Sequence, residues 1–186
     1  MKLPHLTKKQ IKLSGVFIFI LILLIAARWV LPYERSRAAR TNYNTALIAL
    51  EEGNLEQAED YFRQAYKKEP ENYNYLWQLA KTQVRLEKYE KAVESYAELI
   101  SLIPDKSLPY VEQGEAYESL GNFERAEQLY SKGAEVDKNF IKAYLNWASL
   151  ALRQDRRPEA KFILEEGRRN NPDSEELLRL LNSLSK

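Results

Sequence analysis

Few side chains in this sequence are of the types that carry out catalysis. The chain has no cysteine, which excludes disulfides, thiolate nucleophiles and cysteine-bound metals, and it has no phosphate-binding loop or dinucleotide glycine motif. Its one histidine, His5, precedes an apolar run, where it cannot pair with the carboxylates of the rest of the chain as a base or metal ligand. Closely spaced carboxylates, as at Glu112, Glu115 and Glu118, fit the solvated face of a helix. We therefore expect no enzyme activity, no cofactor and no metal.

Charge is divided unevenly along the chain. Residues 1–38 contain seven Lys and Arg against one acidic residue and carry +6, whereas residues 39–186 contain 21 basic and 26 acidic side chains and carry −5. Nucleic-acid backbones are bound by clustered Lys and Arg, and the larger part of the chain has no excess of them. We expect neither a nucleic-acid partner nor a small-molecule substrate.

Residues 13–31, LSGVFIFILILLIAARWVL, are almost entirely apolar and contain one charge, Arg28. At about 1.5 Å per residue, a helix of this length reaches roughly 28 Å, close to the ~30 Å hydrocarbon thickness of a bilayer. Pro32 then offers a stop or a kink. The pattern predicts a basic tail at 1–12, a transmembrane helix at 13–31 that contacts the lipid bilayer, and a juxtamembrane linker at 32–38.

Three interpretations compete for the apolar run. A buried helix of a soluble core is disfavoured because the run has no polar face. A cleaved signal peptide fits Lys8, Lys9 and Lys12, but the run exceeds the usual ~7–15 residues, and Ile25 stands where a small residue should precede cleavage after Ala27. A retained single-span anchor is favoured. Because a lysine-rich tail resists translocation, we expect the N-terminus inside and the rest of the chain outside, with the opposite orientation left open.

The rest of the sequence is periodic, and corresponding residue types recur at every 34th position. Two columns hold small residues, namely Ala46, Ala80, Gly114, Ala148 and Ala58, Ala92, Ala126, Ala160. A third column holds bulky residues, namely Phe62, Tyr96, Tyr130 and Leu164. Three copies close with a proline, at positions 70, 104 and 172. Such regularity indicates one supersecondary unit used four times.

Each copy reads as two helices joined by a tight turn. In the first copy, Ala46 and Ala58 flank the turn sequence EEGN, where Gly53 is free to take the left-handed conformation that ends a helix. From Ala58, steps of four and three reach Phe62 and Ala65, so the three lie on one helical face. Facing small residues let the two helix axes approach closely, and the aromatic ring fills the space against the next hairpin.

The 34-residue pattern of small residues, an aromatic and a closing proline resembles the tetratricopeptide repeat (TPR) family. The resemblance implies an all-α fold, a right-handed α-solenoid with copies at 39–72, 73–106, 107–140 and 141–174. In the fourth copy, Asp155 replaces the turn glycine and Pro158 enters the second helix early. Because proline is tolerated in a first helical turn, we expect that hairpin to form.

A short helix is predicted after the last copy, at 175–186. Asp173 and Glu176 have capping-box spacing, and Leu177, Leu181 and Leu184 fall on one face. Such a helix would cover the apolar face that a stacked array leaves open at its end.

The resemblance also implies a concave groove that holds a peptide or a partner segment and is lined by the first helix of each copy. The family pattern selects Tyr43, Leu47, Leu50, Trp77, Lys81, Val84, Arg85, Val111, Glu115, Glu118, Lys142, Leu145, Ser149 and Arg153. Packing against neighbouring helices is the competing role for each. Chaperone-binding members of the family grip a C-terminal carboxylate with Lys, Asn and Arg at fixed places. Here those places do not restore the clamp, in either the first three copies or the last three.

Together these features favour a membrane-anchored scaffold or adaptor that binds protein partners, in the assembly or organisation of a membrane or envelope complex. The alternative is a structural subunit buried in a larger membrane complex, with Ser14, Gly15 and Arg28 at its interfaces.

Overall fold

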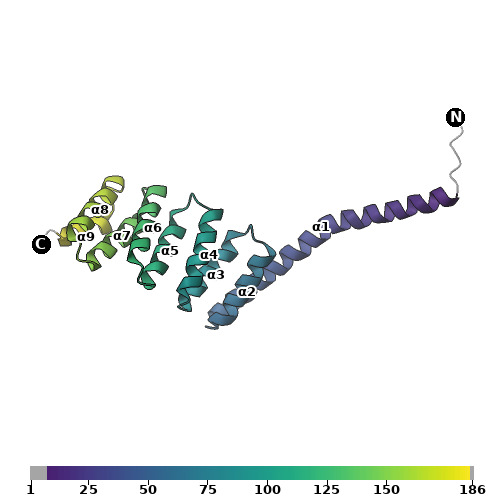
Figure 1. Ribbon diagram of the computed structural model, residues 1–186, viewed down its shortest axis with the longest axis horizontal. Helices are drawn as coiled ribbons and strands as arrows, with labels where there is room; N and C mark the ends of the chain where they lie inside the picture. The colour runs from purple at the N-terminus through teal and green to yellow at the C-terminus, as the bar shows by residue number, and fades with distance from the viewer. Residues whose placement is uncertain (1–7, 185–186) are drawn as a thin grey trace, which may run out of the picture.

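A computed structural model describes residues 8–184, without the side chains of residues 8–15 and 29. The described residues form nine α-helices and no strand. The helices are α1 (Lys8–Glu51), α2 (Leu55–Lys68), α3 (Tyr73–Arg85), α4 (Tyr89–Leu102), α5 (Ser107–Ser119), α6 (Phe123–Val136), α7 (Ile141–Arg153), α8 (Arg157–Asn170) and α9 (Glu175–Leu184). Figure 1 shows α2 to α9 stacked in chain order, with α1 projecting from one end of the stack as a long rod. The predicted all-helical solenoid is confirmed.

Some expectations fall outside the described residues. These are the first seven residues of the predicted tail, including His5, and residues 185–186 of the predicted cap. The packing of Ser14, for which only the backbone is described, belongs with them.

Helix α1 joins the apolar run to the first copy without a break. Pro32 lies inside the helix, so the expected linker at 32–38 is helical, and the expectation of a stop at Pro32 is wrong. A proline removes only one helical hydrogen bond, and the helix is held beyond it because Ala39 and Ala46 are fully buried in the core. The first helix of the array is therefore a direct extension of the apolar run.

The apolar part of α1 is exposed. Over residues 16–31, the described large apolar side chains range from 48% exposed at Ile20 to 76% at Phe17. The helix is long and apolar enough to cross a membrane, and an N-terminal signal sequence has the same features.

The four turns inside the hairpins share one backbone conformation. Gly53, Glu87, Gly121 and Asp155, each one period apart, have φ values of 78°, 57°, 75° and 59°. The turn therefore forms with or without glycine. The fourth hairpin forms as expected, with Pro158 in the first turn of α8.

The small and bulky columns form the core. Every alanine of the two small columns is fully buried, and the bulky column is at most 2% exposed. At Gly114, an added Cβ would lie 2.6 Å from Cε1 of the fully buried Tyr130 ring. Glycine at this position leaves room for the Tyr130 ring, whereas the second copy combines Ala80 with the buried Tyr96.

Helix α9 covers the end of the stack as predicted. Leu177 is fully buried, and Leu181 and Leu184 pack against the same core cluster. The capping residue differs from the expectation. The helix begins at Glu175, and the hydroxyl of Ser174 accepts a hydrogen bond from the Leu177 backbone N–H, so Ser174 takes the place assigned to Asp173.

The contact between Gly114 and Tyr130 can be tested by Gly114→Ala in the detergent-solubilised full chain. Alanine is the better helix former by roughly 1 kcal/mol, but the buried Tyr130 ring is held by the hydrogen bond from its hydroxyl to Glu118, so we expect a net loss of about 1–2 kcal/mol in the free energy of unfolding. Thermal melting followed by circular dichroism measures it. Adding Tyr130→Leu should recover part of the loss, because the double variant then has the same pair of residues as Ala148 and Leu164 at the equivalent positions of the fourth copy. A parental melting temperature for Gly114→Ala alone would contradict the close packing.

The left-handed turns lead to a second prediction, which concerns the stability that glycine gives at positive φ. Glu87→Gly should raise the free energy of unfolding by up to about 1 kcal/mol, because a side chain is strained at positive φ. Gly53→Ala, the matched reverse change, should lower it by a similar amount, and an added Cβ at Gly53 meets no steric obstacle. Urea unfolding of both variants measures the changes. Destabilisation by Glu87→Gly would show that the turn is not strained.

Candidate functional site

The predicted groove residues lie on the first helices of the four copies, α1, α3, α5 and α7. Thirteen of the fourteen keep some exposed surface. Val111 does not: it is fully buried in the core cluster formed by the last two copies, so its assignment to the groove surface is corrected. The cause is the packing of α5 on α6 in the third copy, where Val111 lies near Gly133.

The groove residues of the first copy lie at the edge of the apolar core. Tyr43, Leu47 and Leu50 are half-buried against it. The Tyr43 ring lies 5.6 Å from that of Phe62 and 5.0 Å from that of Tyr75, measured between centroids. Tyr43 therefore packs in the core and also presents an edge to the surface.

Trp77 of the second copy has a polar partner that the sequence analysis missed. Its indole N–H donates a hydrogen bond to the Glu112 carboxylate on the next first helix, α5. Burial raises the pKa of Glu112, and this outweighs the lowering by the Trp77 hydrogen bond and by the charges of Lys81 and Lys142. Glu112 lies 35 residues after Trp77, one more than the period of 34. This spacing, which places the two residues at neighbouring positions of successive first helices, is the sequence signal that could have indicated the pair.

Lys81 and Arg85 follow Trp77 at steps of four along α3. Both side chains are exposed, and neither forms an ion pair within 4.0 Å among the side chains that the structure describes. They leave positive charge available on this part of the groove.

The groove residues of the third and fourth copies pair with one another. Lys142 contacts Glu115 at 2.7 Å, and Asn146 donates to the same carboxylate at 2.7 Å. Arg153 forms an ion pair with Glu118, which also accepts a hydrogen bond from the Tyr130 hydroxyl at 2.9 Å. The structure thus brings together four predicted residues as two ion pairs between α5 and α7. Both pairs are partly exposed, which makes each worth little for stability.

Two hollows lie along this row and share Asn146 and Ser149. One, of about 360 Å³, lies between α5 and α7 and is lined by Glu115, Glu118, Ser119, Tyr130, Asn146, Ser149 and Arg153. The other, of about 690 Å³, lies between α7 and α9 and is lined by Lys142, Leu145, Asn146, Ser149, Glu176, Arg179, Leu180 and Ser183. Six predicted residues line one or both. The contribution of α9 was missed, although α9 begins one period after α7 and so continues the pattern.

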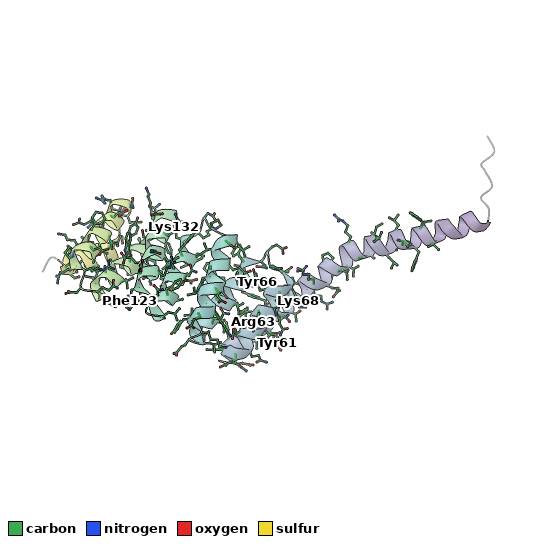
Figure 2. All side chains as sticks on the ribbon, viewed as in Figure 1. Tyr61, Arg63, Tyr66, Lys68, Phe123 and Lys132 are labelled. Atoms are coloured by element: carbon green, nitrogen blue, oxygen red, sulfur yellow. The ribbon has the colours of Figure 1, made fainter. Side chains whose placement is uncertain are left out.

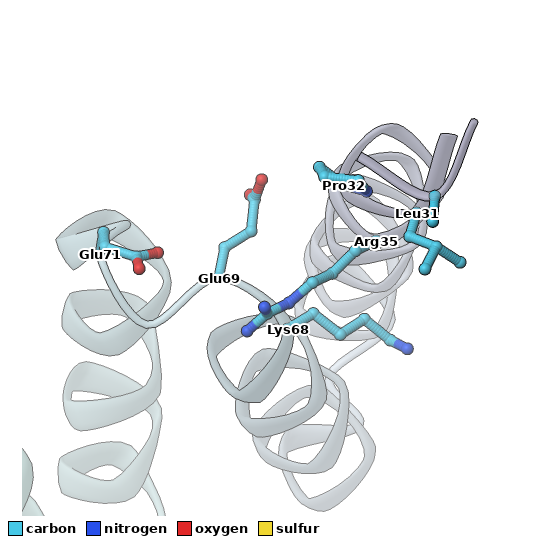
Figure 3. A pocket seen from close by; sticks show the side chains of 7 residues that line it. Leu31, Pro32, Arg35, Lys68, Glu69 and Glu71 are labelled. Atoms are coloured by element: carbon cyan, nitrogen blue, oxygen red, sulfur yellow. The ribbon is translucent and has the colours of Figure 1, made fainter. Parts of the chain in front are cut away.

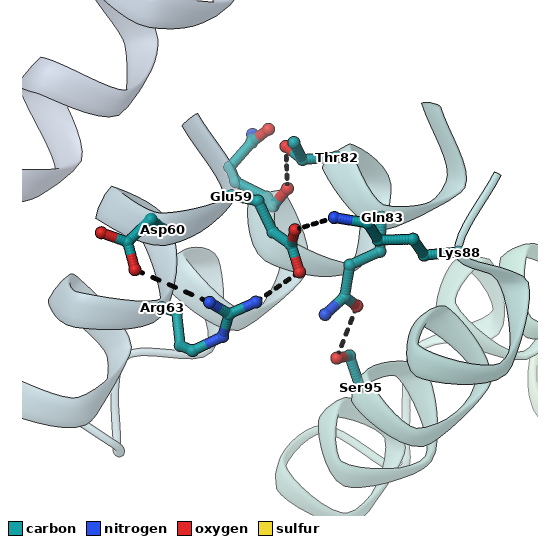
Figure 4. Close-up of polar contacts among 8 residues, drawn as sticks. Glu59, Asp60, Arg63, Thr82, Gln83, Lys88 and Ser95 are labelled. Atoms are coloured by element: carbon teal, nitrogen blue, oxygen red, sulfur yellow. Dashed lines mark hydrogen bonds and ion pairs between the residues drawn. The ribbon is translucent and has the colours of Figure 1, made fainter. Parts of the chain in front are cut away.

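Ion pairs on the second helices connect successive copies. Glu59, only 4% exposed, pairs with Arg63 of its own helix and accepts from Lys88 at 2.6 Å across the copy boundary (Figure 4). The same arrangement recurs two periods later, where Arg156 donates two hydrogen bonds to Glu127 at 2.6 and 3.2 Å. Lys88 and Arg156 are the residues that precede α4 and α8.

Between these junctions the chemistry differs. The residues that precede α2 and α6 are Asn54 and Asn122, and their side chains cap the helices by accepting from backbone N–H groups at 3.3 and 3.2 Å. The turns therefore alternate between a capping asparagine and a cation that reaches back to the previous copy. The chemistry of the turns therefore repeats every two copies, whereas the helical hairpin repeats in every copy.

The sequence matches the tetratricopeptide repeat family over residues 49–112 and 117–184, which together exceed half of the chain. The chain belongs to the tetratricopeptide repeat family. The two matched segments begin two periods apart, in step with the alternating turns. Within the described residues, no group of three His, Cys, Asp or Glu is placed to hold a metal ion.

Several solved TPR structures share the fold. A tetratricopeptide repeat protein from Parabacteroides merdae has a TM-score of 0.69 and 21% identity over 80% of this chain and 59% of its own. MamA from Desulfovibrio magneticus, from residue 41 onward, has a TM-score of 0.65 and 15% identity over 86% and 97%. The first TPR of Spaghetti, bound to an HSP90 peptide, has a TM-score of 0.58 and 19% identity over 64% and 95%.

The buried carboxylate of Glu59 predicts a pH-dependent stability. Burial alone would raise the pKa of Glu59, but the Lys88 hydrogen bond and the charges of Arg63 and Lys88 lower it below the ordinary value of 4.5. A lowered folded-state pKa stabilises the TPR array above pH 4.5, and this contribution is lost as the pH falls through the folded value.

Glu59→Gln should therefore lower the free energy of unfolding by about 1–3 kcal/mol at pH 7, less than the ~3–5 kcal/mol for a fully buried pair because both cations are partly exposed. The difference from the parent should shrink at pH 3, as measured by thermal melting at both pH values. Glu94→Gln, at an exposed position of α4, is the matched control and should change little. An undiminished difference at pH 3 would rule out the charge as its cause.

Proposed function

We propose that this TPR protein is a membrane-anchored adaptor, without chemistry of its own, that binds a segment of a protein partner along the row formed by α3, α5, α7 and α9. The observation that carries the proposal is the continuous pair of hollows over α7, together with the available cations Lys81 and Arg85 on α3. Most side chains that line the two hollows are polar or charged, with Leu145 and Leu180 as apolar members, which suits a peptide that carries polar groups and a few apolar side chains. The sequence and structural likenesses support protein binding of this kind.

The membrane anchor rests on α1. Its exposed apolar side chains would be costly in water, and a bilayer or another protein would cover them. A span that runs directly into the first repeat holds the array at the membrane surface. This geometry suits a protein that organises a membrane or envelope complex, with the body outside and the N-terminus inside.

A chaperone tail is not the partner that we propose, although one solved neighbour is bound to an HSP90 peptide. The places of the carboxylate clamp hold Tyr43, Leu47, Gln78, Leu108 and Glu112 in the first three copies. In the last three copies they hold Trp77, Lys81, Gln113, Lys142 and Asn146. Glu112 accepts from Trp77, and Asn146 and Lys142 both hold Glu115, so these groups already have partners within the chain.

The alternative function is that of a structural subunit, favoured by the uncovered apolar face of α1. The size of the particle after gentle solubilisation separates the two functions. An adaptor is released as a free chain of about 22 kDa plus detergent, whereas a subunit migrates only with its complex.

Site-specific photocrosslinking in native membranes tests the groove. A photoreactive residue at Ser149, which lines both hollows, should give a discrete crosslinked product. Lys81→Glu with Arg85→Glu should reduce that product at least fivefold, because reversed charge opposes an acidic partner while neither cation supports the fold through an ion pair. Immunoblotting against the C-terminus measures the yield.

The matched control is the same photoreactive residue at Phe162, which is 58% exposed on α8, away from the groove helices. Equal products from both positions would place binding outside the groove.

Carbonate extraction tests the anchor separately, because a spanning chain stays in the membrane pellet and a cleaved one does not. Protease treatment of spheroplasts then tests orientation, and digestion of the body from outside is the expected result.

A further inference from the structure

A hollow of about 350 Å³ lies where the apolar rod meets the TPR array. Four residues of α1 form one wall, and the opposite wall is the C-terminal end of α2 with the loop that follows (Figure 3). The lining residues are Ala27, Leu31, Pro32, Arg35, Lys68, Glu69 and Glu71. The hollow exists because α2 runs back along α1 and ends beside the turn that contains Leu31 and Arg35.

The two walls differ in chemistry. Ala27, Leu31 and Pro32 continue the apolar surface of the rod, and Leu31 is 66% exposed. Arg35 reaches from α1 toward the end of α2, beside Lys68 (Figure 3). The site is therefore apolar toward the N-terminal part of α1 and charged toward the array, where Arg35 and Lys68 lie with the carboxylates of Glu69 and Glu71.

The cations of the hollow are available to a ligand. Among the described side chains, neither Arg35 nor Lys68 forms an ion pair, although Glu69 and Glu71 also line the hollow. Glu69 already accepts a hydrogen bond from the Ser36 hydroxyl. A second hollow of about 360 Å³ adjoins this one through Lys68 and adds Arg37, whose nearest acidic partner, Glu34, is 4.0 Å away. Three cations, Arg35, Arg37 and Lys68, thus line the two hollows at the end of α2, together with Glu34, Glu69 and Glu71.

We propose that this hollow binds the headgroup of an anionic phospholipid, with the phosphate between Arg35 and Lys68 and the upper acyl chain along Ala27 and Leu31. A phosphate accepts hydrogen bonds from a guanidinium and an ammonium together, and the apolar wall matches the part of a lipid just below its headgroup. A soluble anion would leave the apolar wall uncovered. An acidic peptide without an apolar flank would leave that wall uncovered as well.

The inference rests on the proposed membrane anchor, which brings the hollow to the level of the lipid headgroups. Because α1 has no linker, Arg35 lies only about 6 Å along the helix from Leu31, the last residue of the apolar run. A headgroup held there would fix the tilt of the first repeat relative to the bilayer.

Lipid binding to the full chain in mild detergent tests the site. Native mass spectrometry is used to compare dioleoyl phosphatidylglycerol with dioleoyl phosphatidylcholine, which share acyl chains and differ in headgroup charge. Two cations at an anionic headgroup should give a preference for phosphatidylglycerol of up to about 30-fold at low salt, a factor of roughly five for each. Arg35→Ala with Lys68→Ala should reduce the preference to about twofold or less.

Arg125→Ala with Lys132→Ala is the matched control, since it removes two exposed cations from α6. Figure 2 shows Lys132 well along the stack from Lys68. The control should keep the parental preference, and thermal melting should show that both double variants fold. Equal binding of the two lipids by the parent, or an unchanged preference in Arg35→Ala with Lys68→Ala, would overturn the site.

Two further outcomes separate the lipid site from the anchor and from a protein ligand. Because lipid binding in detergent does not require insertion, a chain lost from carbonate-washed membranes would overturn the anchor independently. A preference abolished by a polyglutamate peptide at equal charge concentration would identify an acidic protein segment as the ligand and overturn the lipid assignment.

Discussion

The close approach of paired helices depends on small side chains facing bulky ones at every hairpin. Ala58 and Phe62 lie one turn apart on α2, and both are fully buried. At Gly114 the spacing is so small that even a methyl group would meet the Tyr130 ring. Because protein interiors have almost no free volume, the small residues of each hairpin set the distance between its two helices. This distance in turn sets the pitch of the whole stack. The shape of the candidate groove depends on that pitch, because the first helices of successive hairpins would form its walls.

A second constraint connects the array to the apolar rod. The first helix of the first hairpin is also the end of the apolar rod, so the array cannot swing on a flexible linker. The described large apolar side chains of α1 between Val16 and Leu31 are exposed, whereas Ala39 and Ala46 are buried where α2 packs on the helix. One helix therefore provides both the exposed apolar rod and the first helix of the array, and the hollow lined by Arg35 and Lys68 lies where the two parts meet.

Polar contacts organise the copies in pairs. Glu59 with Lys88 and Glu127 with Arg156 link the first copy to the second and the third to the fourth. The buried apolar residues divide similarly into one large cluster for the first two copies and one for the last two, with Ala116 joining the earlier cluster. On the groove side, the second copy keeps its cations available while the third and fourth neutralise theirs. A partner segment would thus meet a cationic stretch over α3 and a mixed one over α5 and α7.

The sequence by itself determined the helical hairpins, their number, the closing cap and the buried columns, because residue types that recur at a fixed period depend only on the chain order. The same register predicted a row of candidate groove residues, and six of them line the two hollows over α7. Tertiary structure alone decided that Val111 is buried, that Trp77 bonds to Glu112, and that α1 passes through Pro32. Each of these depends on which side chains of neighbouring helices meet in space. A one-dimensional pattern specifies which face of a helix is buried, but not the packing distance that separates a core position from a surface one.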